Sequence, residues 1–111
     1  MSDHKESLIH SSMRTKYPNK VPIVVEPITG GNVAFVLDKK KYLVPNNRTL
    51  GWFMAYLRRY HITKLQEGDG LYTVVGNTIP GSNCVLGELL NTHGDEDGLL
   101  QLEIHLESCF G

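Results

Sequence analysis

Apolar residues recur every three or four positions in one segment of the chain, and this spacing predicts a helix. The segment follows Thr49, a residue type that caps helix N-termini, and it ends near Arg58 and Arg59, where positive charge suits the helix dipole. Its apolar members fall at positions i, i+3, i+4 and i+7 and are Leu50, Phe53, Met54 and Leu57. We expect this helix to pack one side against the core.

Trp52 and Tyr56 lie on the same predicted helix, four residues apart and off its apolar stripe. Their rings either complete the core or line a surface groove. The pattern favours the core.

Other segments are rich in β-branched residues or alternate between apolar and polar residues, and these predict strands. The last of them alternates around Leu100, Leu102, Ile104 and Leu106, which indicates one buried face. Pro22 lacks a backbone N–H and therefore favours the start of its strand or a sheet edge. The predicted strands cover residues 21–25, 42–45, 71–75 and 99–106.

Shorter helices are expected over residues 8–17 and 85–92. The apolar run of residues 33–37 is either extended chain or part of the same hairpin arm as residues 42–45. The order is thus helix, strand, strand, helix, strand, short helix, strand. This order predicts an α+β fold in which helices pack on one face of a sheet.

Length and composition suit one soluble globular domain. The chain has 111 residues, of which 41% are apolar and 21% are charged, which is enough for one modest core and atypical of disorder. Its apolar runs are far shorter than the roughly 20 residues of a transmembrane helix, and its polar first residues lack the apolar stretch of a signal peptide. We therefore expect a cytosolic protein with reduced Cys84 and Cys109.

Charge is unevenly distributed along the sequence. Up to Lys64 there are eleven basic and four acidic residues, a formal charge of +7, whereas the remainder carries −8. Lys39, Lys40 and Lys41 adjoin a predicted strand, where lysines either protect a sheet edge from aggregation or attract an acidic peptide, a lipid headgroup or nucleic acid. Both roles are compatible, because an edge kept soluble can still accept a guest strand. Whether the folded chain keeps a basic surface is left open by the sequence.

The sequence contains no group of residues that points to catalysis or to a metal or cofactor site. Cys84 has no activating motif, Ser82 lacks the glycine elbow of hydrolases, and residues 30–31 lack nucleotide-binding spacing. The acidic residues 95–97 favour a solvated turn over a metal site. No histidine is paired at metal-ligand spacing among His4, His10, His61, His93 and His105. We expect no enzymatic activity, no cofactor and no bound metal.

Several segments together resemble one known family. They include the tyrosine-proline turn and the strand that follows it, the lysine-rich strand, the start of the predicted helix, and a terminal glycine after an aromatic residue. In this sequence they are residues 14–26, 37–45, 49–51, 77–80 and 110–111. The family is the autophagy ubiquitin-like modifiers, which include GABARAP and the microtubule-associated-protein light chains, and the resemblance runs from about Arg14 to Gly111.

The resemblance implies a ubiquitin-like β-grasp fold with a four-stranded mixed sheet, packed helices and a shortened N-terminal helical extension. The implied division is a helical extension over residues 1–20, the β-grasp domain over 21–106 and a flexible conjugation tail over 107–111. Only 17 residues precede Pro18, whereas the family usually has two helices there. Tubulin-type or membrane-tethering roles of the extension are therefore not expected.

The resemblance also implies how the protein acts. A cysteine protease exposes the terminal glycine, here Gly111, and activating and conjugating enzymes pass it to phosphatidylethanolamine. The expected protein is cytoplasmic, lies on the autophagosome membrane when lipidated, and has no nucleic-acid partner. Alternatives are conjugation to a protein lysine and a peptide-docking module that is never conjugated.

Family members bind peptides of the form aromatic-x-x-aliphatic in cargo receptors, usually preceded by acidic residues. The peptide adds as a strand beside the strand of residues 41–44. The residues implied for the aromatic pocket are Met13, Pro22, Val24, Lys41, Leu43 and Leu99. Those implied for the aliphatic pocket are Tyr42, Val44, Pro45, Phe53, Tyr56 and Leu57. Lys39 and Lys41 would meet acidic residues, and Arg58 another polar group.

The sequence departs from its relatives at three positions near these pockets. Arg48 stands where they often carry an aliphatic residue, Leu99 where they have phenylalanine, and Tyr60 where a basic residue is usual. We therefore expect a pocket preference that differs from theirs.

Overall fold

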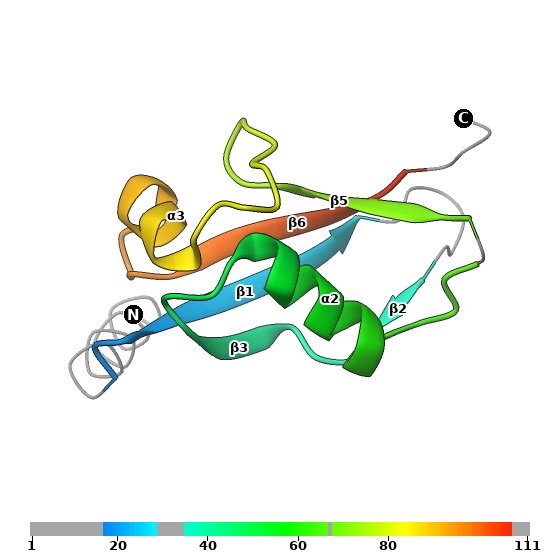
Figure 1. Cartoon of the computed structure of the whole chain (residues 1–111), viewed down its shortest axis with the longest axis horizontal. Coiled ribbons are helices and arrows are strands. Elements are labelled where there is room, and N and C mark those ends of the chain that lie inside the picture. Colours follow the sequence, from blue (N-terminus) through cyan, green and yellow to red (C-terminus); the bar gives the residue numbers. More distant parts are fainter. Residues whose placement is uncertain (1–16, 29–34, 67, 108–111) are drawn as a thin grey trace, which may run out of the picture.

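The computed structural model describes residues 17–28, 35–66 and 68–107, which form a four-stranded sheet, a two-stranded ribbon and two helices (Figure 1). The helix predicted over residues 8–17 lies, except for Tyr17, outside these residues. No helix among those described is long and apolar enough to cross a membrane. The elements are β1 (Lys20–Ile28), β2 (Val36–Leu37), β3 (Lys41–Pro45), α2 (Leu50–Tyr60), β4 (Ile62–Thr63), β5 (Gly70–Val74), α3 (Leu86–His93) and β6 (Leu100–Glu107).

The main sheet has the strand order β3-β1-β6-β5. Strand β1 runs antiparallel to β3, with Val21 opposite Val44, and parallel to β6, with Ile23 opposite Leu100. Strand β5 is antiparallel to β6. Both helices lie on one face of this sheet (Figure 1). The predicted α+β class with a mixed four-stranded sheet is confirmed.

Alternating residues of the strands and the apolar stripe of α2 meet in one core. Because successive side chains of a strand point to opposite faces, every second residue of β1 and β6 faces the helices. From α2, Phe53 is 0% exposed, and its ring packs edge to face with the Tyr42 ring at a centroid distance of 5.3 Å. The remaining strand and helix residues of the core include Val21, Ile23, Val25, Leu50, Leu57, Leu86, Leu89, Leu100, Leu102 and Ile104.

Pro22 occupies an interior strand, although proline favours sheet edges. It lies near the start of β1, opposite Leu43 of β3, and the parallel pairing with β6 begins only at Ile23. Its place near the start of the strand agrees with the expectation. Proline has no backbone N–H, and none is needed at this position for pairing with β6.

The segment before β3 does not belong to the β1–β3 hairpin. Val36 and Leu37 form β2 and pair with Thr63 and Ile62 of β4 in a separate ribbon. The sequence did not predict β4, because a two-residue strand is too short to show any periodicity.

Backbone hydrogen bonds connect two neighbouring regions. One region is the β3–α2 turn with the start of α2, and the other is the start of α3 with the segment before it. Gly51 N–H donates to the Ser82 carbonyl at 2.8 Å, and Gly87 N–H donates to the Asn46 carbonyl at 2.9 Å. A Cβ added to Gly51 would lie 3.1 Å from the Ser82 carbonyl oxygen, and a Cβ added to Gly87 would lie 3.0 Å from the Asn46 carbonyl oxygen. The absence of side chains at these glycines therefore lets the two helices start close together, beside the end of β3.

We predict that Phe53→Ala lowers the free energy of unfolding by about 3–5 kcal/mol, because it leaves a cavity under Tyr42. Tyr60→Ala removes a ring from the same helix that is 59% exposed and should cost less than about 1 kcal/mol. Urea unfolding followed by circular dichroism compares the two variants. Equal losses would show that Phe53 is not a core residue.

Candidate functional site: the β3 edge and its groove against α2

Strand β3 forms one margin of the main sheet. It pairs with β1 on one side, and no described strand pairs with its other side. A strand in this position presents unpaired backbone N–H and C=O groups to a guest strand.

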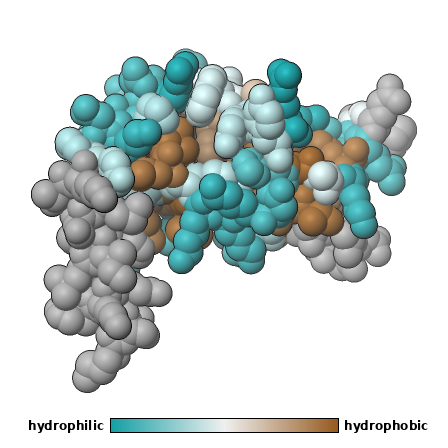
Figure 2. Space-filling view, turned by 90° about the horizontal axis from the view of Figure 1, so that it is seen from below, coloured by the Kyte–Doolittle hydropathy of each residue, from teal (hydrophilic) through white to brown (hydrophobic). Residues whose placement is uncertain are grey.

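The lysines beside β3 give this margin a positive charge. Lys40 lies 3.8 Å from Glu26, and both side chains are more than half exposed, so this pair contributes little to stability. Lys39 and Lys41 are exposed and form no ion pair with any other described residue. Figure 2 views the molecule from the side on which β3 lies, and hydrophilic residues cross the middle of this face between two hydrophobic patches.

A pocket of about 180 Å³ lies between β3 and α2. Its walls include the aromatic rings of Tyr42, Trp52 and Tyr56. Trp52 stacks on Tyr56 at 5.7 Å, and Tyr56 meets Tyr42 edge to face at 6.5 Å. Aromatic walls of this kind suit an apolar side chain. The lining residues are Lys39, Tyr42, Leu43, Val44, Pro45, Trp52 and Tyr56.

This pocket contains four of the six residues expected for the aliphatic pocket, namely Tyr42, Val44, Pro45 and Tyr56. Phe53 and Leu57 were expected there too, but both are 0% exposed and neither is among the residues that line this pocket. They belong to the core-facing stripe of α2, which turns them away from the surface.

The residues expected for the aromatic pocket come mostly from the opposite face of the sheet. Pro22 lies opposite Leu43, and Val24 lies opposite Lys41, on the face that alternation turns away from the helices. Leu99 immediately precedes β6. Met13 and the conjugation residue Gly111 lie outside the described residues. Arg58 is exposed in the last turn of α2 and does not line the pocket beside β3.

Trp52 was missing from the expected site, because the sequence pattern favoured the core for it. It is 38% exposed, and the Arg48 guanidinium lies over its ring at 4.9 Å. Tyr56 is half-buried and packs against the core. The expectation of a core position is therefore met in part for Tyr56. The signal that could have placed Trp52 at the surface was its position off the apolar stripe.

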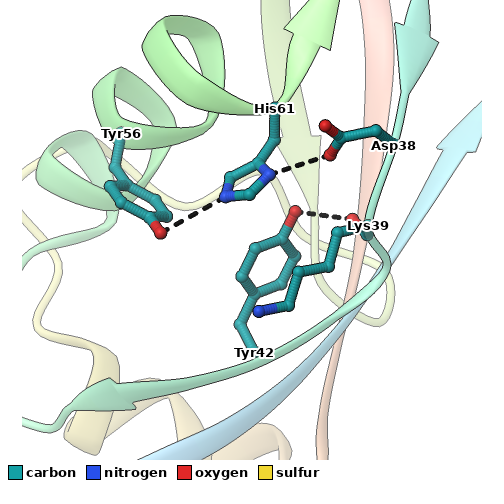
Figure 3. Close-up of polar contacts among 5 residues, drawn as sticks. All are labelled: Asp38, Lys39, Tyr42, Tyr56 and His61. Atoms are coloured by element: carbon teal, nitrogen blue, oxygen red, sulfur yellow. Dashed lines mark hydrogen bonds and ion pairs between the residues drawn. The ribbon is translucent and has the colours of Figure 1, made fainter.

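Hydrogen bonds to His61 hold the Tyr56 wall in position (Figure 3). The imidazole Nδ1 lies 2.8 Å from an Asp38 carboxylate oxygen, and Nε2 lies 3.2 Å from the Tyr56 hydroxyl. Because a carboxylate only accepts, neutral His61 donates from Nδ1 and accepts the Tyr56 hydroxyl proton at Nε2. On the other side of the pocket, the Tyr42 hydroxyl donates to the Lys39 carbonyl at 2.5 Å.

Burial raises the pKa of Tyr42 to about 12, with smaller contributions from the Asp38 carboxylate and Tyr56. The folded protein therefore holds this proton more tightly than the unfolded chain, in which a tyrosine pKa is about 10. Its contribution to stability is complete below pH of about 10 and is lost as the pH rises towards 12.

We predict that the free energy of unfolding falls more steeply between pH of about 10 and 12 in the wild type than in Tyr42→Phe. Urea titrations followed by circular dichroism at a series of pH values measure the slope. Tyr60→Phe, which keeps Tyr42, should retain the wild-type slope. Equal slopes in the wild type and Tyr42→Phe would contradict the raised pKa.

The fold has close counterparts among solved structures. The crystal structure of Trypanosoma brucei ATG8 superposes with a TM-score of 0.77 at 25% identity, covering 97% of this chain and 90% of that one. Plasmodium falciparum Atg8 in complex with a Plasmodium falciparum Atg3 peptide gives a TM-score of 0.79 at 29% identity, covering 97% and 93%. The expected ubiquitin-like fold is thereby confirmed.

Sequence comparisons agree with the structural ones. The Dictyostelium discoideum autophagy-related protein 8 is 34% identical over 99% of this chain and 91% of its own length. The Arabidopsis thaliana autophagy-related protein 8a is 36% identical over 91% and 80%. A family model described as autophagy protein Atg8, ubiquitin-like, matches residues 5–111. The chain therefore belongs to the Atg8 family of autophagy ubiquitin-like proteins.

Proposed function

We propose that this chain is a non-enzymatic modifier that is conjugated through Gly111 to phosphatidylethanolamine and docks aromatic-x-x-aliphatic peptides along β3. The observation that carries the docking half is the combination of an unpaired β3 margin, exposed lysines and an aromatic-walled pocket. The conjugation half rests on the family match, which extends through Gly111. The protein would be cytoplasmic and would lie on the autophagosome membrane when lipidated.

In the docked complex, the guest backbone would add to β3 as a further strand. Its aliphatic side chain would enter the pocket beside Tyr42 and Tyr56. Its aromatic side chain would lie at the sheet face of Pro22, Val24 and Leu43, with Leu99 and Met13 as further expected contacts. Lys39 and Lys41 attract the acidic residues that precede the aromatic one, which raises the association rate more than the affinity.

The proposed partners fall into two groups. The first comprises the processing cysteine protease and the activating and conjugating enzymes, and the Atg3 peptide bound to the Plasmodium falciparum relative supports a conjugating enzyme as a docking partner. The second comprises cargo receptors with aromatic-x-x-aliphatic motifs. If one groove serves both groups, the conjugating enzyme and a cargo receptor would compete for it. Conjugation and cargo capture could then not occur on the same molecule at the same time.

We predict that an acidic aromatic-x-x-leucine peptide shifts the NMR signals of residues 41–45 and of the Trp52 indole N–H. Lys41→Glu should weaken binding roughly tenfold, because it places a like charge beside the acidic residues. Lys64→Asn is the control, since it removes a charge away from the groove and suits the positive φ of 66° at Lys64. Absence of shifts at about millimolar peptide would remove peptide docking from the proposal and leave conjugation standing.

We predict that Gly111→Ala abolishes conjugation by the activating and conjugating enzymes of the same organism, because the added side chain obstructs a narrow enzyme channel. Ser108→Ala in the same tail should conjugate normally. Mass spectrometry before and after phospholipase D treatment identifies the product. Normal conjugation of Gly111→Ala would contradict the proposal, and an adduct that resists phospholipase and contains a peptide would indicate conjugation to protein lysine.

A further inference from the structure

Three aromatic side chains follow one another along the outer side of α2. Trp52, Tyr56 and Tyr60 are spaced four residues apart, and neighbouring ring centroids lie 5.7 Å and 5.2 Å from each other. We call these three residues the aromatic ladder. The ladder borders a hollow of about 480 Å³, which is also lined by Ala55 and Arg59.

Core packing explains only the middle ring of the ladder. Tyr56 packs against the core, but Trp52 is 38% exposed and Tyr60 is 59% exposed. Contacts between residues four apart on an isolated helix are worth only about 0.2–0.5 kcal/mol per pair, and aromatic residues have weaker helix propensity than lysine or glutamate. Exposed tryptophan and tyrosine beside a hollow are instead typical of binding surfaces.

The two ends of the ladder carry positive charge. The Arg48 guanidinium lies 4.9 Å from the Trp52 ring centre, and that of Arg59 lies 5.5 Å from the Tyr60 ring centre. Neither arginine forms an ion pair within the part of the chain that the structure describes. A partner that covers the rings would therefore be favoured if it brought carboxylates to both ends.

The ladder is continuous with the proposed peptide groove. Trp52 and Tyr56 line the pocket beside β3 and also the hollow on α2. A peptide whose aliphatic side chain fills the pocket would therefore lie beside Trp52 and Tyr56, the two rings that also border the hollow. The next residues of that peptide are thus the nearest available occupant of the hollow.

We propose that the partner peptide continues past its aliphatic residue onto the aromatic ladder, with an apolar side chain over Ala55 and carboxylates near Arg48 and Arg59. This inference rests on the proposed peptide docking and adds a second acidic segment to the ligand. Arg48 and Tyr60 are two of the positions at which the family resemblance leads us to expect a difference from relatives. The ladder would consequently give this chain its own preference among partners that share the same core motif.

The test uses the full chain and two peptides. The short peptide has three acidic residues followed by phenylalanine, two valines and leucine. The long peptide continues from that leucine with two acidic residues, a second leucine and two more acidic residues. Trp52 is the only tryptophan in the chain, so its fluorescence reports binding without a label. The extension should tighten binding about tenfold, and higher salt should reduce this gain.

Two variants distinguish binding at the aromatic ladder from binding at the groove beside β3. Tyr60→Ala and Arg59→Ala should each reduce the gain from the extension to less than about twofold while leaving the affinity for the short peptide unchanged. Lys64→Asn, which removes a charge elsewhere, should keep the full gain. The short peptide also shows that the variants are folded.

The outcomes distinguish the two proposals. Failure of the short peptide to bind would reject peptide docking itself. Binding of the short peptide with no gain from the extension, or with a gain that survives in both ladder variants, would reject the role of the ladder and leave peptide docking standing. A Trp52 response to vesicles of phosphatidylcholine and phosphatidylserine that is lost in Tyr60→Ala, with no gain from the extension, would overturn the peptide assignment in favour of a lipid surface.

Discussion

Hydrogen bonding of β1 on both sides places β3 and β6 in the sheet, and β5 is then added through β6. Because β1 pairs with β6 along one side and with β3 along the other, β3 is held at the sheet margin. The margin needs protection from aggregation, and the lysines beside it supply that. The same arrangement leaves a backbone edge next to α2, and the proposed docking of a guest strand depends on this edge.

The alternation of side chains along β3 lets one short strand serve two different surfaces. Tyr42 and Val44 turn towards α2, where they belong to the core and also line the pocket, whereas Lys41 and Leu43 turn to the opposite sheet face. The groove therefore has a rigid floor, because its floor is the outer layer of the core. His61 and the Asp38 carboxylate add a hydrogen-bonded support behind Tyr56.

Periodicity in the sequence was sufficient for the elements that bury one face. The stripe of Leu50, Phe53 and Leu57 and the alternation of β6 predicted their structures to within about one residue of their ends. It could not predict the β2–β4 ribbon, because two residues show no period. It also could not separate the wall of a pocket from the core beneath it, since Phe53 and Tyr56 both carry large aromatic rings that can pack in either place. Trp52 shows the opposite case, because its position off the apolar stripe was the available signal for its exposure, and the preference of large aromatic residues for the core outweighed that signal.

The pairing of β1 with β6 has a consequence for how the chain folds. These strands stand at opposite ends of the described sequence, yet they are adjacent in the sheet, as Ile23 and Leu100 illustrate. Contacts of such high sequence separation slow folding, because the entropy of closing a long loop is lost before the contact forms. During synthesis, β1, β3 and α2 leave the ribosome long before β6, so one side of β1 stays without its partner. Until β6 emerges, the nascent chain therefore exposes the side of β1 that β6 covers in the finished sheet, in addition to the outer edge of β3. This interval favours aggregation, because an unpaired strand edge can pair with another chain.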